Sequence, residues 1–305
     1  MKRLISASCA AIALAITPAT PVVAQEAGTV ASVSQQGTGE GPALWKLQDE
    51  DTTIYLFGTI HLLPPNVEWL NAPIANALAS SDVLITEIPA GAGEDAASQA
   101  VIMRKATLPE GKTLRGLLSA EQRKSYEAGL RQMRIPAQAF DRIEPWMVGM
   151  TMALLPLVQA GYSPEAGVEE VLEASAPPTM DRGALETFEQ QMNMLDSLPM
   201  ASQIHFMVEA AKDPARTVAS TDAMVNSWLK GDSDAIGRLT AEEMTDPTVN
   251  AVLLYDRNKA WSEWIDARMD RPGVVFIAVG AAHLAGAKSV QDYLGQAGIE
   301  TTRVQ

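Results

Sequence analysis

Cysteine and histidine are scarce in this chain of 305 residues, which has one cysteine and three histidines. The cysteine, Cys9, lies in an apolar stretch near the N-terminus, so the chain beyond residue 24 has no thiol. A chain without thiols cannot form disulfides, thiolate metal sites or a cysteine nucleophile. Histidine imidazoles and carboxylates are then the candidates for metal binding and for acid–base chemistry.

Basic residues are a minority too, because 23 lysines and arginines face 37 acidic residues and the net charge is −14. An acidic chain repels phosphate backbones, so we expect no nucleic-acid partner. The sequence lacks a glycine-rich phosphate loop, and we expect no nucleotide cofactor. It also lacks Gly-x-Ser-x-Gly and His-Glu-x-x-His, which leaves serine hydrolases and helix-borne zinc proteases without motif support.

Long apolar runs are missing beyond the N-terminus. The nearest candidate, residues 147–158, is shorter than the ~20 residues that cross a bilayer and contains Pro156, which favours a buried helix. After signal cleavage we therefore expect no transmembrane span.

The N-terminus has the pattern of a Sec-type secretory signal peptide. Lys2 and Arg3 precede a short apolar stretch, residues 4–16, and Val22-Val23-Ala24 ends in small residues. We expect a signal peptide over residues 1–24 with cleavage after Ala24, a disordered leader over 25–42 and a single domain over 43–305. The protein would then be periplasmic or secreted; an uncleaved anchor is the alternative, but the run is short for one.

The sequence Gly-x-x-His occurs twice, each time directly after an apolar run that reads as a strand. Residues 54–57 precede Gly58-Thr59-Ile60-His61, and residues 274–279 precede Gly280-Ala281-Ala282-His283. Both copies continue with a helical pattern and then an apolar or β-branched strand, residues 83–88 and 299–304. The chain ends therefore resemble two related β-α-β units.

The sequence between the two units, about residues 94–270, reads as helical, with one possible short strand at 178–180. We expect an α/β fold that leans towards α+β. Its mixed central sheet would combine the two β-(Gly-x-x-His)-α-β units, with the large helical segment inserted between them.

The carboxyl edge of such a sheet is where open α/β folds hold ligands. His61 and His283 would both project there, and Glu87 ends the strand that follows the first unit's helix. Two histidines and a carboxylate suit a divalent metal, so we predict His61, His283 and Glu87 as ligands.

Other polar residues are candidates of lower weight. Arg257 and Asn258 could stabilise developing charge and orient substrate or water. Glu169 and Glu186 are weaker candidates, because both also fit ordinary helix positions. His205 lacks the glycine frame, and we expect it to pack on a helix.

Taken together, these segments resemble the TraB/GumN family, which includes the Tiki-type proteins. The matching segments follow the family's order and span about residues 44–304: 55–65, 85–87, 161–169, 185–187, 256–261 and 279–284. Thr86 and the Ala281-Ala282 pair depart slightly from the usual pattern, and neither change removes a proposed ligand.

The resemblance implies one site built from both Gly-x-x-His segments and an acidic residue, and Tiki-type members are metal-dependent proteases. It favours manganese or cobalt over zinc. We therefore expect an exported divalent-metal-dependent hydrolase, with peptides or small molecules as substrates. Glu87 would serve as ligand or as general base. The alternative is a cell-envelope protein that binds a metal, haem or another small ligand without turnover.

Overall fold

The computed structural model describes residues 41–305, and the predicted signal peptide and nearly all of the predicted leader lie outside them. Helices predominate, and six strands form one mixed sheet, which confirms the predicted α/β class. The strands are β1 (Leu44–Gln48), β2 (Thr52–Thr59), β3 (Val83–Thr86), β4 (Asp181–Ala184), β5 (Gly273–Gly280) and β6 (Thr302–Arg303).

The helices beside the sheet include α1 (Ala72–Ala79), α6 (Val168–Ser175), α12 (Asp256–Met269) and α13 (Val290–Gln296). The central part of the chain adds α2 (Ala96–Ala106), α3 (Leu114–Leu117), α4 (Ala120–Gln132), α5 (Pro145–Gln159), α7 (Phe188–Asp196), α8 (Met200–Lys212), α9 (Pro214–Leu229), α10 (Ser233–Glu243) and α11 (Pro247–Asn250). Within residues 41–305, three short helical turns complete the elements: η2 (Pro164–Ala166), the π-helical η3 (Ala251–Tyr255) and η4 (Ala281–Leu284).

The two β-α-β units share one sheet, and their strands interleave. The strand order is β4-β3-β5-β2-β1-β6, so β5 of the second unit lies between β2 and β3 of the first. β2 and β5 pair in parallel with Gly58 opposite Val279 and Thr59 opposite Gly280. The two Gly-x-x-His segments therefore leave adjacent strands at the same edge of the sheet.

Two strand predictions need correction. The short strand expected at residues 178–180 is β4, at Asp181–Ala184, which pairs with β3. The strand expected over 299–304 contracts to Thr302–Arg303, because it meets the sheet only at β1, where just two residue pairs form. Arg303, which alignment of the two units sets opposite Glu87, thus lies at the far edge of the sheet from β3.

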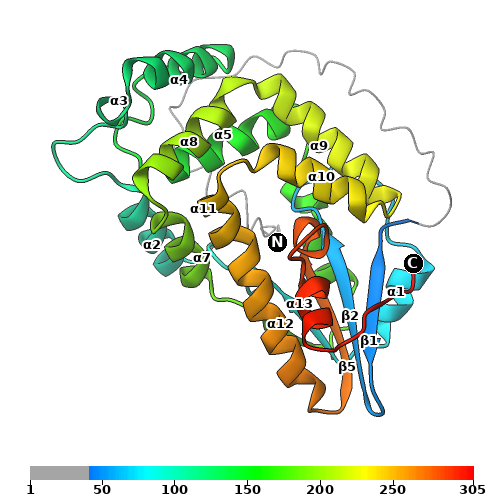
Figure 1. Cartoon of the computed structure of the whole chain (residues 1–305). Coiled ribbons are helices and arrows are strands. Elements are labelled where there is room, and N and C mark those ends of the chain that lie inside the picture. The colour runs from blue at the N-terminus through cyan, green and yellow to red at the C-terminus, as the bar shows by residue number, and fades with distance from the viewer. Residues whose placement is uncertain (1–40) are drawn as a thin grey trace, which may run out of the picture.

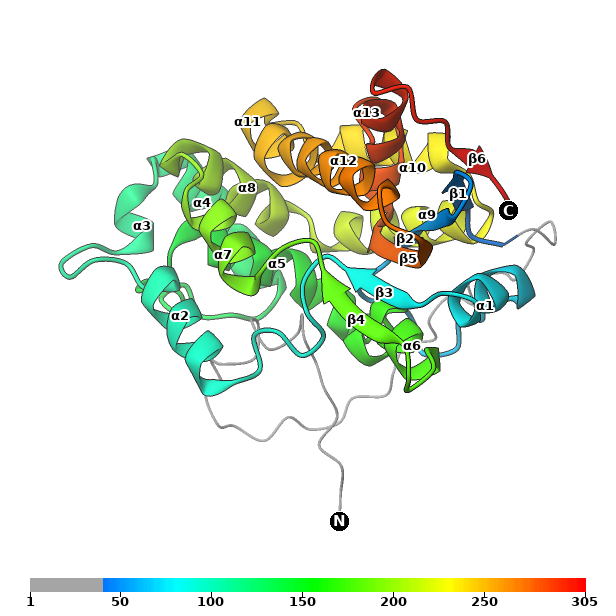
Figure 2. The same ribbon diagram turned by 90° about the horizontal axis from the view of Figure 1, so that it is seen from below.

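Helices cover both faces of the sheet, as Figure 2 shows. On one face, α12 and α13 contribute Trp261, Ile265 and Leu294 to a core with Ile54 and Ile277 of the strands. On the other face, α1 and α6 pack with α9 over a second core. Its centre is a ring cluster of Phe57, Trp69, Trp228 and Phe276, with Phe57 and Trp69 stacked at 5.6 Å between centroids.

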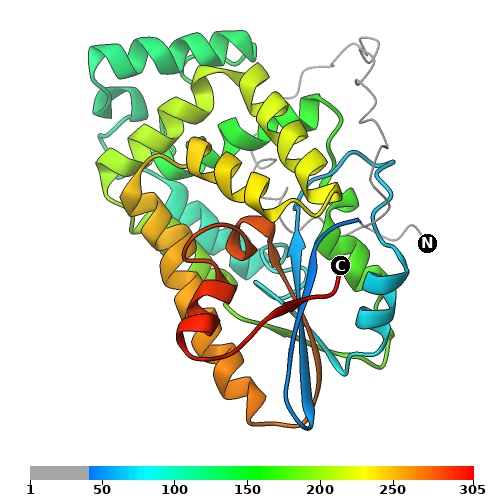
Figure 3. The ribbon, with the colours of Figure 1, turned by 45° about the vertical axis from the view of Figure 1, so that its right-hand side comes forward.

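The central helices stack beyond the carboxyl ends of β2 and β5 (Figures 1 and 3). Residues of α4, α5 and α8 form a core of their own around Tyr126, Leu130, Met152 and Met207. A capping box begins α4, where Ser119 and Gln122 bond reciprocally. Both Gly-x-x-His segments leave the sheet at the edge that faces this helical layer.

Within the described part of the chain, no helix is both long enough and apolar enough to cross a membrane. The apolar segment at 147–158 forms α5, whose Trp146, Val148 and Met152 are fully buried.

Candidate active site

The glycines of the two Gly-x-x-His segments have different roles. A Cβ at Gly58 would stand 3.0 Å from the Ala281 Cα, so this glycine allows the two segments to pack backbone against backbone. A Cβ at Gly280 would stand 3.2 Å from Glu87 Oε1, 3.5 Å from His283 Cδ2 and 3.8 Å from His61 Nε2. Gly280 therefore marks the point that both histidines and the predicted carboxylate surround.

His61 lies at the mouth of the site and is oriented by Glu169. Its Nδ1 is 2.7 Å from Glu169 Oε1, and the same oxygen accepts a 2.5 Å hydrogen bond from the Thr59 hydroxyl. Burial raises the pKa of Glu169, but His61 and the two hydrogen bonds outweigh it and leave the pKa below its usual value. An ionised Glu169 holds a proton on Nδ1 and directs Nε2 towards the Gly280 side of the site.

Glu87, just beyond β3, is 9% exposed and has both oxygens in hydrogen bonds. Oε1 accepts the Gly280 N–H at 2.7 Å, and Oε2 accepts from Arg257 at 2.6 Å and from Gln191 at 3.2 Å. Burial alone would raise the pKa of Glu87, but Arg257, the two histidines and the Gly280 N–H together hold it well below its usual value. Glu87 is therefore a carboxylate.

Arg257, in the first turn of α12, donates all five of its guanidinium N–H groups to hydrogen bonds within the protein. Nε and Nη2 bond both oxygens of Glu186 at 2.8 and 2.9 Å, and Nη2 also bonds Glu87. Nη1 donates to the Leu253 carbonyl at 3.1 Å and to His283 Nε2 at 3.1 Å. Leu253 belongs to the π-helical turn η3, a local departure from the α-helix that often accompanies functional sites.

His283, in η4, is 4% exposed and also has both nitrogens engaged. Because an arginine only donates, Nε2 must accept from Arg257, and Nδ1 must carry the proton that is shared with Asn258 Oδ1 at 2.6 Å. Asn258 is held the right way round because its Nδ2 donates to the Lys288 carbonyl at 2.8 Å. Burial, together with the nearby Arg257, lowers the pKa of His283 to about 3, against the opposing effect of Glu87.

The predicted metal triad does not fit a metal in this arrangement. His283 has no nitrogen lone pair left for a metal, since Arg257 holds Nε2 and Nδ1 is protonated. Across residues 41–305, no three histidine, cysteine, aspartate or glutamate side chains are placed to bind one ion. His61 and Glu87 remain as donors that face the same space.

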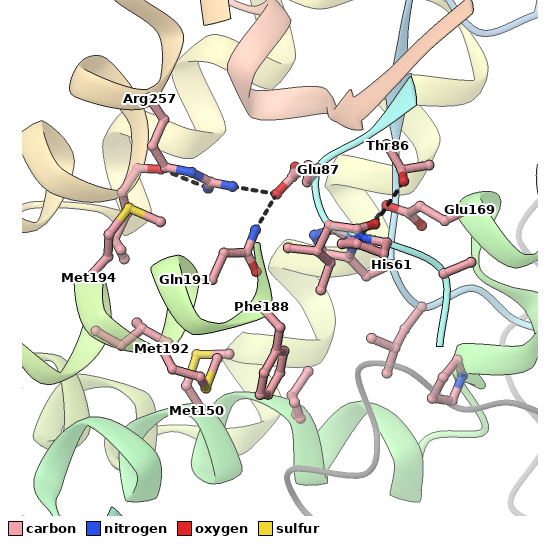
Figure 4. A pocket seen from close by; sticks show the side chains of 18 of the residues that line it. His61, Thr86, Glu87, Met150, Glu169, Phe188, Gln191, Met192, Met194 and Arg257 are labelled. Atoms are coloured by element: carbon pink, nitrogen blue, oxygen red, sulfur yellow. Dashed lines mark hydrogen bonds and ion pairs between the residues drawn. The ribbon is translucent and has the colours of Figure 1, made fainter. Parts of the chain in front are cut away.

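A cavity of about 280 Å³ opens beside this polar cluster, between the sheet edge and the helical layer. Figure 4 shows its two ends: Glu87, Gln191, Arg257, His61 and Glu169 on one side, and Phe188, Met192 and Met150 on the other. Its polar end is therefore the site described above, and the rest of its wall is largely apolar.

Comparison with known proteins assigns the chain to a family. Residues 43–303 match the sequence model of the TraB/PrgY/gumN family. The chain belongs to that family. It is also 22% identical over 266 residues to an uncharacterised protein of Treponema pallidum (strain Nichols), covering 82% of this chain and 79% of the relative. No solved structure matches the chain.

In this TraB/PrgY/gumN member, the structure brings all seven predicted site residues together. His61, Glu87, Glu169 and Arg257 line the cavity. Glu186, Asn258 and His283 stand behind them and hold Arg257 and each other in place. His205 lies elsewhere, and the prediction that it packs on a helix is wrong, since it is exposed on α8 and 3.4 Å from the Thr245 hydroxyl.

Two residues of the site were missed from the sequence. Gln191 of α7 donates to both Glu87 and Glu186, at 3.2 and 3.1 Å. Trp261 donates to Glu186 at 3.0 Å, and its ring also contacts the Arg257 guanidinium and the His283 ring, whose centres are 4.6 and 4.5 Å away. Trp261 could have been found, because it lies one helical turn after Arg257 within the family segment. Gln191 carries no such signal in an ordinary amphipathic helix.

Proposed function

We propose that the protein is a hydrolase of esters or amides, with His61 as general base. The observation that carries the proposal is the His61–Glu169 pair at 2.7 Å, with His61 at the cavity and its side chain 48% exposed. A carboxylate that holds Nδ1–H leaves Nε2 as a base, which is the arrangement used to deprotonate water or a hydroxyl group.

In the proposed step, His61 Nε2 accepts a proton from water as the water oxygen attacks the substrate carbonyl carbon. The imidazolium then returns the proton to the leaving oxygen or nitrogen as the carbonyl bond to it breaks. Glu169 stabilises the transient imidazolium. Arg257 contributes positive charge beside the carbonyl, but offers no further N–H unless one of its partners is displaced.

The test is turnover of a panel of fluorogenic esters and peptides by the purified chain. General-base catalysis is worth about 10²–10⁴-fold, so His61→Gln should lower kcat by at least about 100-fold. His205→Gln is the matched control, because His205 is exposed on α8, away from the cavity, and should keep the full rate. A His61→Gln enzyme with wild-type kcat would refute the proposed base.

The same panel tests the metal expectation that the resemblance brings. Each reaction is run after chelation and again with added Mn²⁺, Co²⁺ or Zn²⁺. Turnover that requires manganese or cobalt, with Arg257 displaced from His283 in the metal-loaded protein, would support His61, His283 and Glu87 as metal ligands. It would refute the role of His61 as a metal-free general base.

The second candidate is ligand binding without turnover. It is supported by the fully hydrogen-bonded state of Glu87, Arg257 and His283, which resembles a structural network more than a reactive one. Stoichiometric ligand binding with no hydrolysis of any ester or amide would favour it.

Export is also proposed, on the signal-like N-terminus alone. Cell fractionation should place the chain in the periplasm or medium, and mass spectrometry should find Gln25 as its first residue. Recovery of the full-length chain from the cytoplasm would contradict export.

A further inference from the structure

The cavity beside the polar cluster has more apolar wall than hydrolysis of a small polar substrate would need. Trp146, Met150, Leu154, Phe188, Met192 and Leu253 line it, from the two helices α5 and α7 and the η3 turn. Methionine side chains are flexible and polarisable, and they adapt to apolar ligands of varied shape. Ligand sites are commonly of this kind, apolar with a few polar groups at one end.

The charged groups of the same cavity are mostly acidic. Glu87, Glu169, Glu170 and Glu173 line it, and among the lining residues from the described range 41–305 Arg257 is the one arginine or lysine. The guanidinium of Arg257 is shared by two carboxylates, those of Glu87 and Glu186. Glu173 pairs with Arg182, which lies outside the cavity, at 2.6 Å. Among the described residues at the polar end, carboxylates therefore outnumber the one guanidinium, and an anionic ligand would meet mainly like charge.

We infer that the cavity binds an apolar chain whose polar end is cationic or neutral, and that it rejects the same chain with an anionic end. The inference deepens the proposed function, since such a chain would be the acyl or side-chain arm of the substrate. The apolar arm lies along Met150, Met192 and Phe188, and the polar end lies at His61 and Glu87 (Figure 4).

The experiment measures binding, which does not depend on turnover. The purified chain is titrated with the neutral fluorophore N-phenylnaphthylamine, and the bound probe is displaced with decylamine, decanol or decanoate, three ligands that share one apolar chain. We expect one saturable probe site, displacement by decylamine and decanol, and at least about 10-fold weaker displacement by decanoate, because like charges repel strongly beside a low-dielectric wall. Decanoate as effective as decylamine, or absence of a saturable site, would overturn the inference.

Two variants locate the ligand. Met150→Trp fills the cavity and should weaken probe binding at least about 10-fold, whereas Met103→Trp changes a methionine of α2 that is 51% exposed and should leave binding unchanged. Unchanged probe binding in Met150→Trp would place the ligand elsewhere and reject the inference.

The two proposals can fail separately. If the His61→Gln protein binds the probe normally but no substrate is turned over by the wild-type protein, the cavity inference stands and the hydrolase proposal falls. If esters are hydrolysed at rates independent of acyl length and the probe does not bind, the hydrolase proposal stands and the cavity inference falls.

Discussion

The guanidinium of Arg257 donates to Nε2 of His283 across 3.1 Å, at the one imidazole lone pair that a metal would need. Asn258 holds the other nitrogen in its protonated form, and the Lys288 carbonyl holds Asn258. Of two histidines in the same sequence frame, His283 is thus an internal part of the site and His61 is its exposed member. The duplicated motif therefore places its two histidines in different environments.

The state of His283 gives a spectroscopic prediction. With a pKa of about 3, the imidazole should remain neutral and protonated at Nδ1 from neutral pH down to pH 5. Nitrogen-15 NMR can check this easily, because the chain has only three histidines. An imidazole of His283 that is protonated at Nε2, or that titrates near its ordinary value of about 6.5, would contradict the hydrogen-bond assignment.

The same low pKa affects stability against acid. The unfolded chain binds a proton at His283 near pH 6.5 while the folded chain does not until about pH 3, so unfolding takes up a proton between these values. The free energy of unfolding should therefore fall as the pH drops from 6.5 towards 3, and the low pKa of Glu87 acts in the same direction below about pH 4. Urea unfolding at a series of pH values measures this; a midpoint that rises on acidification would contradict it.

Arg257 should be essential for folding stability, because it neutralises two buried carboxylates. Arg257→Met leaves Glu87 and Glu186 without their cation, and breaking such a buried pair costs about 3–5 kcal/mol. Lys259→Met on the same helix is the control, since its pair with Glu263 is exposed, and we expect a change within about 0.5 kcal/mol. Equal urea midpoints for the two variants would show that the cluster does not stabilise the fold.

Features of this site that depend on neighbouring residues could be predicted from the sequence, whereas contacts between residues far apart in the chain could not. The strand-end histidines and Glu87 could be predicted, because a Gly after a strand and a carboxylate within an apolar run are local signals. That Arg257 would use all its N–H groups could not be predicted, since its three side-chain partners lie 26, 71 and 170 residues away in the chain. The position of β4 and the short length of β6 likewise depend on pairing with β3 and β1, which the sequence alone does not reveal.

Glu169 should act on rate through the orientation of His61. Glu169→Gln keeps the size of the side chain but can present an amide N–H to Nδ1, which favours the wrong tautomer and should lower kcat by about 100-fold with little change in KM. Glu165→Gln, an exposed residue that does not line the cavity, should keep the wild-type kcat. A Glu169→Gln enzyme whose loss lies in KM alone would assign Glu169 to substrate binding instead.

Gly280 should be required for the site but not for the fold. Its backbone, at φ −48° and ψ 133°, is open to alanine, yet the added methyl group would press on Glu87 Oε1 at 3.2 Å and come into van der Waals contact with both imidazoles. The carboxylate must shift by a few tenths of an ångström, which weakens its 2.7 Å bond from the Gly280 N–H and its bond from Arg257. We expect kcat to fall by about 10-fold or more, the imidazole nitrogen-15 shifts of His61 and His283 to move, and the free energy of unfolding to change by less than about 1 kcal/mol.

Gly295→Ala is the matched control for Gly280→Ala. Nothing lies within 4 Å of its added Cβ in α13, so it should stabilise the protein by about 0.5–1 kcal/mol and leave the imidazole shifts and kcat unchanged. If the imidazole shifts of Gly280→Ala coincide with those of Gly295→Ala, the two histidines do not meet at Gly280.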